Sequence, residues 1–274
     1  MITKIHHLNC GTLCPAGGRL VNRSPAKMIC HCLLIESTSG LILVDTALGT
    51  RDVLQSQENL SFPFRLFAQP SLDIEETAVR QIEKLGFSKA DVQHIILTHL
   101  DMDHAGGLSD FPDAKIHVFS TEFNAATNPA GLIERLRYHS SQWRHQPKWV
   151  VHEQKGESWF GFNSVRQLEG LPPEILLIPL AGHTRGHCGI AVEASSGWLL
   201  HAGDAYYFQG EMDPLRPRSS LGLSIFQRVM EMDREKRLLN QVRLRKLIHH
   251  HGDQIKVFCS HDPAEFESFS NISH

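Results

Sequence analysis

The sequence lacks long apolar runs and a strong net charge. No stretch of its 274 residues approaches the roughly 20 consecutive apolar residues that a membrane-spanning helix needs. The first residues also lack the charged start and apolar run of a signal peptide. A formal net charge of −3 offers no general attraction to nucleic acid or to anionic membranes. We therefore expect a cytoplasmic protein with neither nucleic acid nor a membrane as its partner.

The motifs of several enzyme classes are absent as well. The chain has no Gly-x-Ser-x-Gly elbow, no glycine-rich phosphate loop and no cysteine-centred catalytic signature. It has only 6 cysteines, and a cytosolic chain of this length does not need disulfides for stability. In Cys30-His31-Cys32, strand alternation places the two cysteines on one face and His31 on the other. We favour packing for the cysteines over a metal site, and leave open whether His31 faces a pocket.

Histidine, in contrast, is abundant, with 18 residues in the chain. The most informative stretch is Thr98–Gly107, which follows the apolar run Ile95-Ile96-Leu97. It places four potential metal ligands within six positions: His99, Asp101, Asp103 and His104. Imidazole and carboxylate are ligands of hard or borderline divalent metals. Side chains crowded into one turn at a strand end can converge on such an ion, so the stretch predicts a metal site.

This stretch resembles the H-x-H-x-D-H signature of the metallo-beta-lactamase superfamily, except that Asp101 stands at its second histidine. Further landmarks of the family follow in order along the chain: Asp45 in Leu-Val-Asp-Thr, His183 in Gly-His-Thr-Arg-Gly-His, Asp204 in Ala-Gly-Asp and His261 in Ser-His-Asp. Together they extend over nearly the whole sequence. The resemblance implies an α/β fold, a four-layer αββα sandwich with the metal site at one edge of its two sheets.

The resemblance also implies a ligand set for two divalent ions. His99, Asp101 and His183 would hold an ion at the first position, and Asp103, His104 and His261 an ion at the second, with Asp204 bridging them. Zinc is the first expectation for these ions. Because Asp101 adds a carboxylate where the family has an imidazole, manganese or iron becomes more plausible. Asp101→His is expected to restore the common ligand set.

Other residues of the predicted site have supporting roles. Asp45 closes a buried strand, so its carboxylate should accept hydrogen bonds from neighbours of the site. We interpret His187 as structural and His201 as packing or support for the ligands. Asp103 is predicted to be catalytic as well as a ligand. Tyr207, which lies three residues after Asp204, is the other catalytic candidate.

Within the superfamily, Asp204-Ala205-Tyr206-Tyr207 resembles the lactonase-like branch, that of N-acyl homoserine lactonases and pyridoxolactonases. The resemblance implies a dinuclear metallohydrolase that cleaves a lactone or other carboxylic ester with a metal-bridging hydroxide. Tyr207 would donate a hydrogen bond to the forming oxyanion or the leaving oxygen. The alternatives are a thioester hydrolase of glyoxalase II type and an iron-dependent oxidoreductase on the same fold.

Length and periodicity predict one domain, 1–274, in which strands alternate with helices. The predicted strands are 2–9, 28–36, 41–45, 92–97, 115–119, 175–180, 189–193, 198–201 and 255–259, and the predicted helices are 71–86 and 221–251, the latter with a break. The segment 121–165 lacks clean periodicity but contains Trp143, Trp149, Trp159, Phe160 and Phe162. It is interpreted either as a lid or pocket wall, or as an irregular excursion that its aromatics fix to the core.

Overall fold

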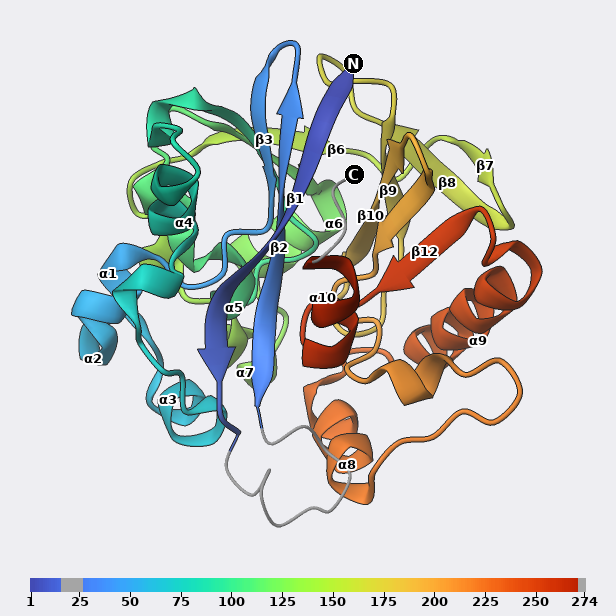
Figure 1. The fold of residues 1–274 in the computed structure, drawn as a ribbon. Coiled ribbons are helices and arrows are strands. Elements are labelled where there is room, and N and C mark those ends of the chain that lie inside the picture. Colours follow the sequence, from blue (N-terminus) through green and yellow to red (C-terminus); the bar gives the residue numbers. More distant parts are fainter. Residues whose placement is uncertain (16–26, 271–274) are drawn as a thin grey trace.

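A computed structural model describes residues 1–15 and 27–270 of the chain. Within them two six-stranded sheets pack face to face, with helices on their outer faces (Figure 1). The first sheet has the order β1 (Ile2–Leu13), β2 (Met28–Ser37), β3 (Gly40–Val44), β4 (Val92–Ile96), β5 (Lys115–Phe119), β6 (Lys148–His152). The second has the order β12 (Ile255–Phe258), β11 (Gly197–His201), β10 (Cys188–Ala194), β9 (Ile175–Pro179), β8 (Phe162–Gln167), β7 (Glu157–Trp159).

Both sheets are mixed. β1, β2 and β3 pair antiparallel, whereas β3 to β6 run parallel to one another. In the second sheet β7 to β11 pair antiparallel, and β12 joins β11 in parallel. The turn at Ser39-Gly40 makes the predicted hairpin between β2 and β3. Since parallel strands need a crossover, the connections around β4, β5 and β12 contain the helices.

The described helices are α1 (Thr50–Leu54), α2 (Ser56–Asn59), α3 (Phe62–Ala68), α4 (Ala78–Lys84), α5 (Met102–Ala105), α6 (Ser120–Thr127), α7 (Leu132–Arg137), α8 (Leu221–Met230), α9 (Arg234–His251) and α10 (Pro263–Ser270). Figure 1 shows α4 outside the first sheet and α9 outside the second, so the layers follow the order helix, sheet, sheet, helix. No helix in the described ranges combines the length and apolarity that a bilayer crossing requires.

Alternation along β2 explains how the layers hold together. Leu33 and Ile35 point into the core between the two sheets, while Cys32 and Leu34 point to the core beneath the helices of the first sheet. All four side chains are buried. Each sheet is therefore covered on both faces, which is why its strands read as nearly continuous apolar runs. The predicted αββα sandwich is confirmed.

The helix predicted over 71–86 is interrupted in the structure. A 3-10 turn covers Ile74–Glu76, and α4 begins only at Ala78. Thr77 between them is extended (φ −59°, ψ 145°), and its hydroxyl donates to the Ile74 carbonyl at 2.7 Å. This local bond competes with helix propagation. The break predicted within 221–251 is confirmed, because α8 ends at Met230 and Asp233 caps α9 by accepting from the amide of Lys236.

The segment 121–165 contains regular structure that periodicity did not reveal. It forms α6, α7, β6 and β7, and it contributes the first residues of β8. Trp149 on β6 meets Phe123 edge-on at a ring separation of 5.3 Å. Trp159 meets Trp198 of the second sheet edge-on, also at 5.3 Å. These aromatic side chains thus pack the segment against the two sheets.

Candidate metal centre

The candidate ligands come from loops that follow strands β4, β9, β11 and β12. They are His99, Asp101, Asp103 and His104 after β4, His183 after β9, Asp204 after β11 and His261 after β12. The strands deliver these loops to one edge of the sandwich, as predicted. All of these side chains are nearly buried, and Asp103 is the most exposed at 13 %. Residues distant in sequence are thus gathered around one point.

Asp204 lies at the centre of this cluster. Its Oδ1 is 3.3 Å from Nε2 of His104 and 3.2 Å from Nε2 of His261. Its Oδ2 is 3.5 Å from Nε2 of His183 and 3.9 Å from Nε2 of His99. Oδ1 therefore faces His104 and Oδ2 faces His183 and His99, whereas Nε2 of His261 is also 3.3 Å from Oδ2 and so contacts both oxygens. A carboxylate that bridges two ions needs this division between its oxygens.

Asp101 lies among the ligands predicted for the first position. Its Oδ2 is 3.0 Å from Nε2 of His183 and 3.5 Å from Nε2 of His99. The ligand atoms of these residues all lie within 4.8 Å of one another. Although an aspartate side chain is shorter than a histidine, Asp101 reaches the same point as its two neighbours. The structure therefore brings the predicted set for the first position together.

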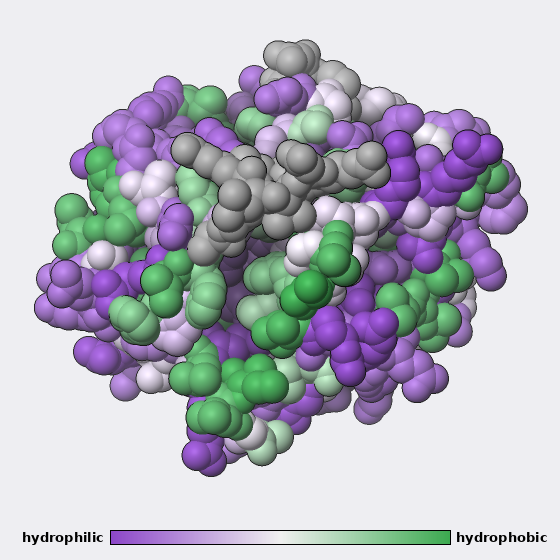
Figure 2. Space-filling model, turned by 90° about the horizontal axis from the view of Figure 1, so that it is seen from below, coloured by the Kyte–Doolittle hydropathy of each residue, from purple (hydrophilic) through white to green (hydrophobic). Residues whose placement is uncertain are grey.

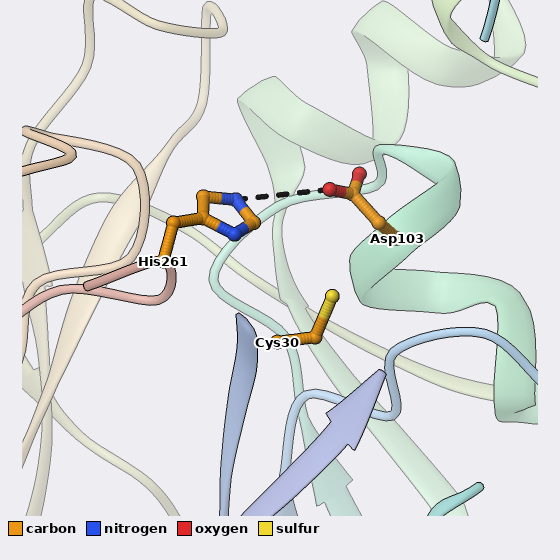
Figure 3. A group of neighbouring side chains, drawn as sticks. All are labelled: Cys30, Asp103 and His261. Carbon is orange, nitrogen blue, oxygen red and sulfur yellow. Dashed lines mark ion pairs between the residues drawn. The ribbon is translucent and has the colours of Figure 1, made fainter. Parts of the chain in front are cut away.

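At the second position Cys30 lies with two of the predicted ligands, Asp103 and His261 (Figure 3). The third predicted ligand, His104, groups instead with His99 and Asp204. Nε2 of His261 is 3.7 Å from Oδ2 of Asp103. Sγ of Cys30 lies within 4.8 Å of the ligand atoms of both residues. Alternation holds, since Cys30 and Cys32 share a face and His31 lies on the other. However, the packing interpretation of Cys30 is incomplete, because β2 begins beside the His261 loop, where Ile29 N bonds the His261 carbonyl.

The side chains at this centre fit a metal ion. Four buried atoms have no hydrogen-bond partner among the described residues: Nε2 of His99, Nε2 of His104, Oδ1 of Asp101 and Oδ1 of Asp204. Buried polar atoms without partners are costly, and native proteins rarely keep them without a reason. Here they converge from several loops, and each is a nitrogen or oxygen atom of the kind that divalent metals bind. Ligation of a metal ion would satisfy them.

Asp45 supports the ligand loop as predicted. Its carboxylate accepts hydrogen bonds from the amide of Thr98 at 2.8 Å, its hydroxyl at 2.7 Å and Nδ1 of His104 at 2.9 Å. Burial acts to raise the pKa of Asp45, but the charge and hydrogen bond of His104 outweigh it and hold the pKa below its usual value. Burial acts to lower the pKa of His104, but the carboxylates of Asp204 and Asp45 outweigh it and raise this pKa well above its usual value, so Nδ1 donates to Asp45 while Nε2 carries a proton towards Asp204. A metal ion would displace the Nε2 proton, and Nδ1 would keep its bond to Asp45.

His187 and the glycine beside Asp204 position the bridging residue. Nδ1 of His187 donates to the Leu180 carbonyl at 3.0 Å, and its Nε2 accepts from the amide of Asp204 at 2.9 Å. Both ring nitrogens are hydrogen-bonded to backbone groups, which agrees with the structural role expected for His187. Gly203 has φ +55°, and a Cβ there would come within 2.5 Å of the same ring. Only glycine lets the chain turn this close to His187.

Glu122 on α6 was not found from the sequence. This fully buried carboxylate accepts from Leu100 N at 2.9 Å, Tyr138 Oη at 3.1 Å, Thr184 Oγ1 at 2.7 Å and Gly186 N at 3.1 Å. It therefore ties the loop of His99 to the loop of His183. No sequence signal indicated it, because α6 carries no motif and its partners lie in distant loops.

Arg137, the last residue of α7, was not predicted either. Its Nη1 lies 2.9 Å from Oδ2 of Asp101 and 2.9 Å from Nε2 of His183. Burial and the Arg137 charge lower the pKa of His183 to about 4, so this imidazole is neutral at neutral pH. The same charge, with that of His99, outweighs burial and holds the pKa of Asp101 well below its usual value. The first position therefore has a fixed cation beside it.

Tyr207 adds a phenol to the centre. Its hydroxyl donates to Oδ2 of Asp204 at 2.9 Å and lies 3.2 Å from Nδ1 of His183. Its ring is stacked on His261 at 5.4 Å with an interplanar angle of 5°. Burial and the Asp204 carboxylate raise the pKa of Tyr207 well above its usual value, so it remains a proton donor. Tyr206 points elsewhere and donates to Glu265 at 2.8 Å.

A protein-family model matches more than half of this chain. The model of the metallo-beta-lactamase superfamily covers residues 26–241. The chain belongs to this superfamily. A probable metallo-hydrolase of Mycobacterium tuberculosis is 41 % identical to this chain over 261 residues, which are 95 % of this chain and 80 % of that protein. An N-acyl homoserine lactonase of Bacillus cereus is 28 % identical over 238 residues, 80 % of this chain and 86 % of the lactonase.

Solved structures show the same superfamily fold. An N-acyl homoserine lactone hydrolase with N-hexanoyl-L-homoserine bound at its catalytic metal centre matches with a TM-score of 0.73 and 22 % identity. The match covers 98 % of this chain and 96 % of that one. A dizinc quorum-quenching lactonase matches with a TM-score of 0.56 and 18 % identity, over 96 % and 86 % of the two chains. The predicted family and fold are confirmed, and the chain is a hydrolase of this superfamily.

Proposed function

We propose that this protein is a dinuclear metallohydrolase that opens a lactone or cleaves a related carboxylic ester. The observation that carries the proposal is the place of Tyr207, whose hydroxyl lies between Asp204 and His183 at the junction of the two metal positions. A phenol held there can donate to an ester oxygen next to the ions. The lactonases among the relatives support the same chemistry.

The ligand set assigns roles around the reacting ester. His99, Asp101 and His183 would hold one ion, Asp103, His104 and His261 the other, and Asp204 both. Two such ions would supply Lewis-acid polarisation of the carbonyl and a water of lowered pKa. Zinc remains the first expectation for them, and Asp101 keeps manganese and iron open.

The protein groups around that centre control protons. Tyr207 is kept protonated by burial, so it can donate to the oxyanion or to the leaving alkoxide. Asp103 is the most exposed carboxylate of the ligand set, so it is the one that substrate and solvent can reach. We assign it the proton transfer that accompanies attack of water on the ester.

An apolar surface near Tyr207 indicates the acyl part of the substrate. Phe226 on α8 meets the Tyr207 ring edge-on at 5.3 Å. Large apolar side chains of α7 and α8 are 39 to 77 % exposed: Leu132, Ile133, Leu136, Leu221, Ile225, Phe226 and Val229. Figure 2 shows apolar side chains gathered on the lower face, where these helices lie in Figure 1. Such a surface suits an apolar acyl chain better than a charged group.

The proposal is tested with a substrate panel. Metal-loaded protein is offered N-acyl homoserine lactones with short and long acyl chains, simple carboxylic esters and glutathione thioesters. We expect lactone opening, a higher kcat/KM for longer acyl chains, loss of activity with a chelator and recovery on adding metal. Selective cleavage of the thioesters would instead identify a glyoxalase II type enzyme. Full ester hydrolysis by metal-free protein would contradict the proposal.

A further inference from the structure

Arg137 contacts two of the residues that would bind a divalent ion at the first position. Only 2 % of its side chain is exposed, and Nη1 is 2.9 Å from both Oδ2 of Asp101 and Nε2 of His183. Nη2 donates to the carbonyl oxygen of Met230 at the end of α8. The guanidinium is thus held between two helices and directed at two candidate ligands.

The contact with His183 determines what that imidazole can bind. Nε2 of His183 faces both Nη1 of Arg137 at 2.9 Å and Oδ2 of Asp101 at 3.0 Å. Arginine has only donors, so in the tautomer that bonds Arg137 the Nε2 atom accepts and the ring proton is on Nδ1, facing the Tyr207 hydroxyl at 3.2 Å. A neutral imidazole nitrogen has one lone pair in the ring plane. This lone pair can accept a hydrogen bond from the guanidinium or bind a metal ion, but not both at once. Arg137 and the ion at the first position therefore compete for His183.

Asp101 explains why a cation is present at this position. A carboxylate there adds one negative charge relative to an imidazole, and the Arg137 charge balances it. The two oxygens of Asp101 have different surroundings: Oδ2 pairs with Arg137, while Oδ1 has no hydrogen bond among the described residues. The second position has no comparable cation, because in the described part of the chain Asp103, His104 and His261 form no ion pair with a lysine or arginine.

We propose that Arg137 is an internal competitor that makes the two metal positions unequal. The ion at Asp103, His104 and His261 binds tightly, and the ion at the first position binds at least about tenfold more weakly because it must displace the guanidinium from His183. At limiting metal the protein then holds one ion, with Arg137 as the second positive charge. This inference rests on the metal centre of the proposed function and is independent of the substrate.

A metal titration tests the competition directly. Wild-type protein is titrated with Zn²⁺ and with Mn²⁺ against a chromophoric chelator, and bound metal is counted by mass spectrometry at each step. We expect one tight equivalent and one at least tenfold weaker. In Arg137→Gln the weaker equivalent should tighten about tenfold or more, while the tight one stays unchanged. Arg135→Gln is the matched control, since it removes a charge from the exposed side of the same helix.

Either of two results would overturn the inference. One is a wild-type titration in which both equivalents bind with the same affinity, a measurement that needs no variant to fold. The other is a folded Arg137→Gln protein, checked by circular dichroism, whose two dissociation constants equal those of the wild type. Neither result depends on lactone opening, so failure of the substrate panel and failure of this inference are distinguishable.

Discussion

The hydroxyl of Tyr207 donates a hydrogen bond of 2.9 Å to Oδ2 of Asp204, the oxygen that faces His183 and His99. In the proposed dinuclear centre this bond would connect a proton donor to the residue that both ions share. The phenol would then lie beside the ester oxygen that gains charge. The bond also means that Tyr207 has a partner before substrate arrives, so donation to substrate requires only a change of acceptor.

Tyr207→Phe should lower kcat for lactone opening by about 10²-fold, the usual cost of removing one donor to a developing oxyanion. Metal content should stay unchanged, because Tyr207 is not among the candidate ligands. Steady-state kinetics together with metal analysis measure both quantities. An unchanged kcat would show that the phenol does not act on the substrate.

The neighbouring tyrosine provides the control. Tyr206 is equally buried, but its hydroxyl donates to Glu265 and not to the metal centre. Tyr206→Phe should therefore keep turnover within about twofold and lower the free energy of unfolding by about 1 kcal/mol, the net value of one hydrogen bond. A large loss of kcat in both variants would indicate a general disturbance of the loop.

Asp45→Asn should weaken metal binding by about 10- to 100-fold, as expected when the partner of a ligating histidine is lost. The single amide oxygen can replace either Oδ1, which accepts from the Thr98 amide, or Oδ2, which accepts from the Thr98 hydroxyl and His104 Nδ1. Either the ligand loop or the His104 ring therefore loses its acceptor. Chelator competition measures the affinity. Asp110→Asn is a suitable control, because Asp110 bonds Thr50 and no candidate ligand. Equal affinities in wild type and Asp45→Asn would contradict this role.

The sequence could predict that the candidate ligands lie close together, because they lie in short loops directly after apolar strands. His99 to His104 could be read as one turn, and Asp204 and His261 each close a recognisable strand. Glu122 and Arg137 could not be predicted. Both lie on short helices without a motif, and their role comes from contacts with loops 22 to 64 residues away. Such contacts depend on how the two sheets pack together, and the periodicity of the sequence holds no information about that packing.

The strands were likewise predicted where apolar runs were long, and missed where they were short. β7 has only three residues, Glu157–Trp159, and lies at the edge of its sheet. Its residues are exposed or half-buried, so no alternating pattern marks it. β6 is also an edge strand, and charged Lys148 begins it. Edge strands bury less surface, so their sequences carry less information about them.

Glu265 should make stability fall as the pH rises from about 5 to 8. Burial raises its pKa to about 8 in the folded protein, against a usual value near 4.5. Between these values the folded state keeps a proton that the unfolded chain releases, so raising the pH favours unfolding, by at most about 1.4 kcal/mol per pH unit. Urea unfolding at constant metal saturation measures this. Glu265→Gln, which mimics the protonated form, should lose this part of the pH dependence, and an identical slope in both proteins would contradict it.

Asp101→His tests the departure from the family signature, and Arg137 changes what this substitution should do. The new imidazole is neutral, so Arg137 would lose its ion-pair partner and still contact His183. We therefore expect Asp101→His alone to bind the ion at the first position no more tightly than wild type. The double variant Asp101→His/Arg137→Gln should bind two equivalents with similar affinity and favour zinc over manganese. Metal counting after dialysis at limiting zinc measures both proteins. Two tight equivalents in the single variant would show that Asp101, and not Arg137, sets the affinity of the first position.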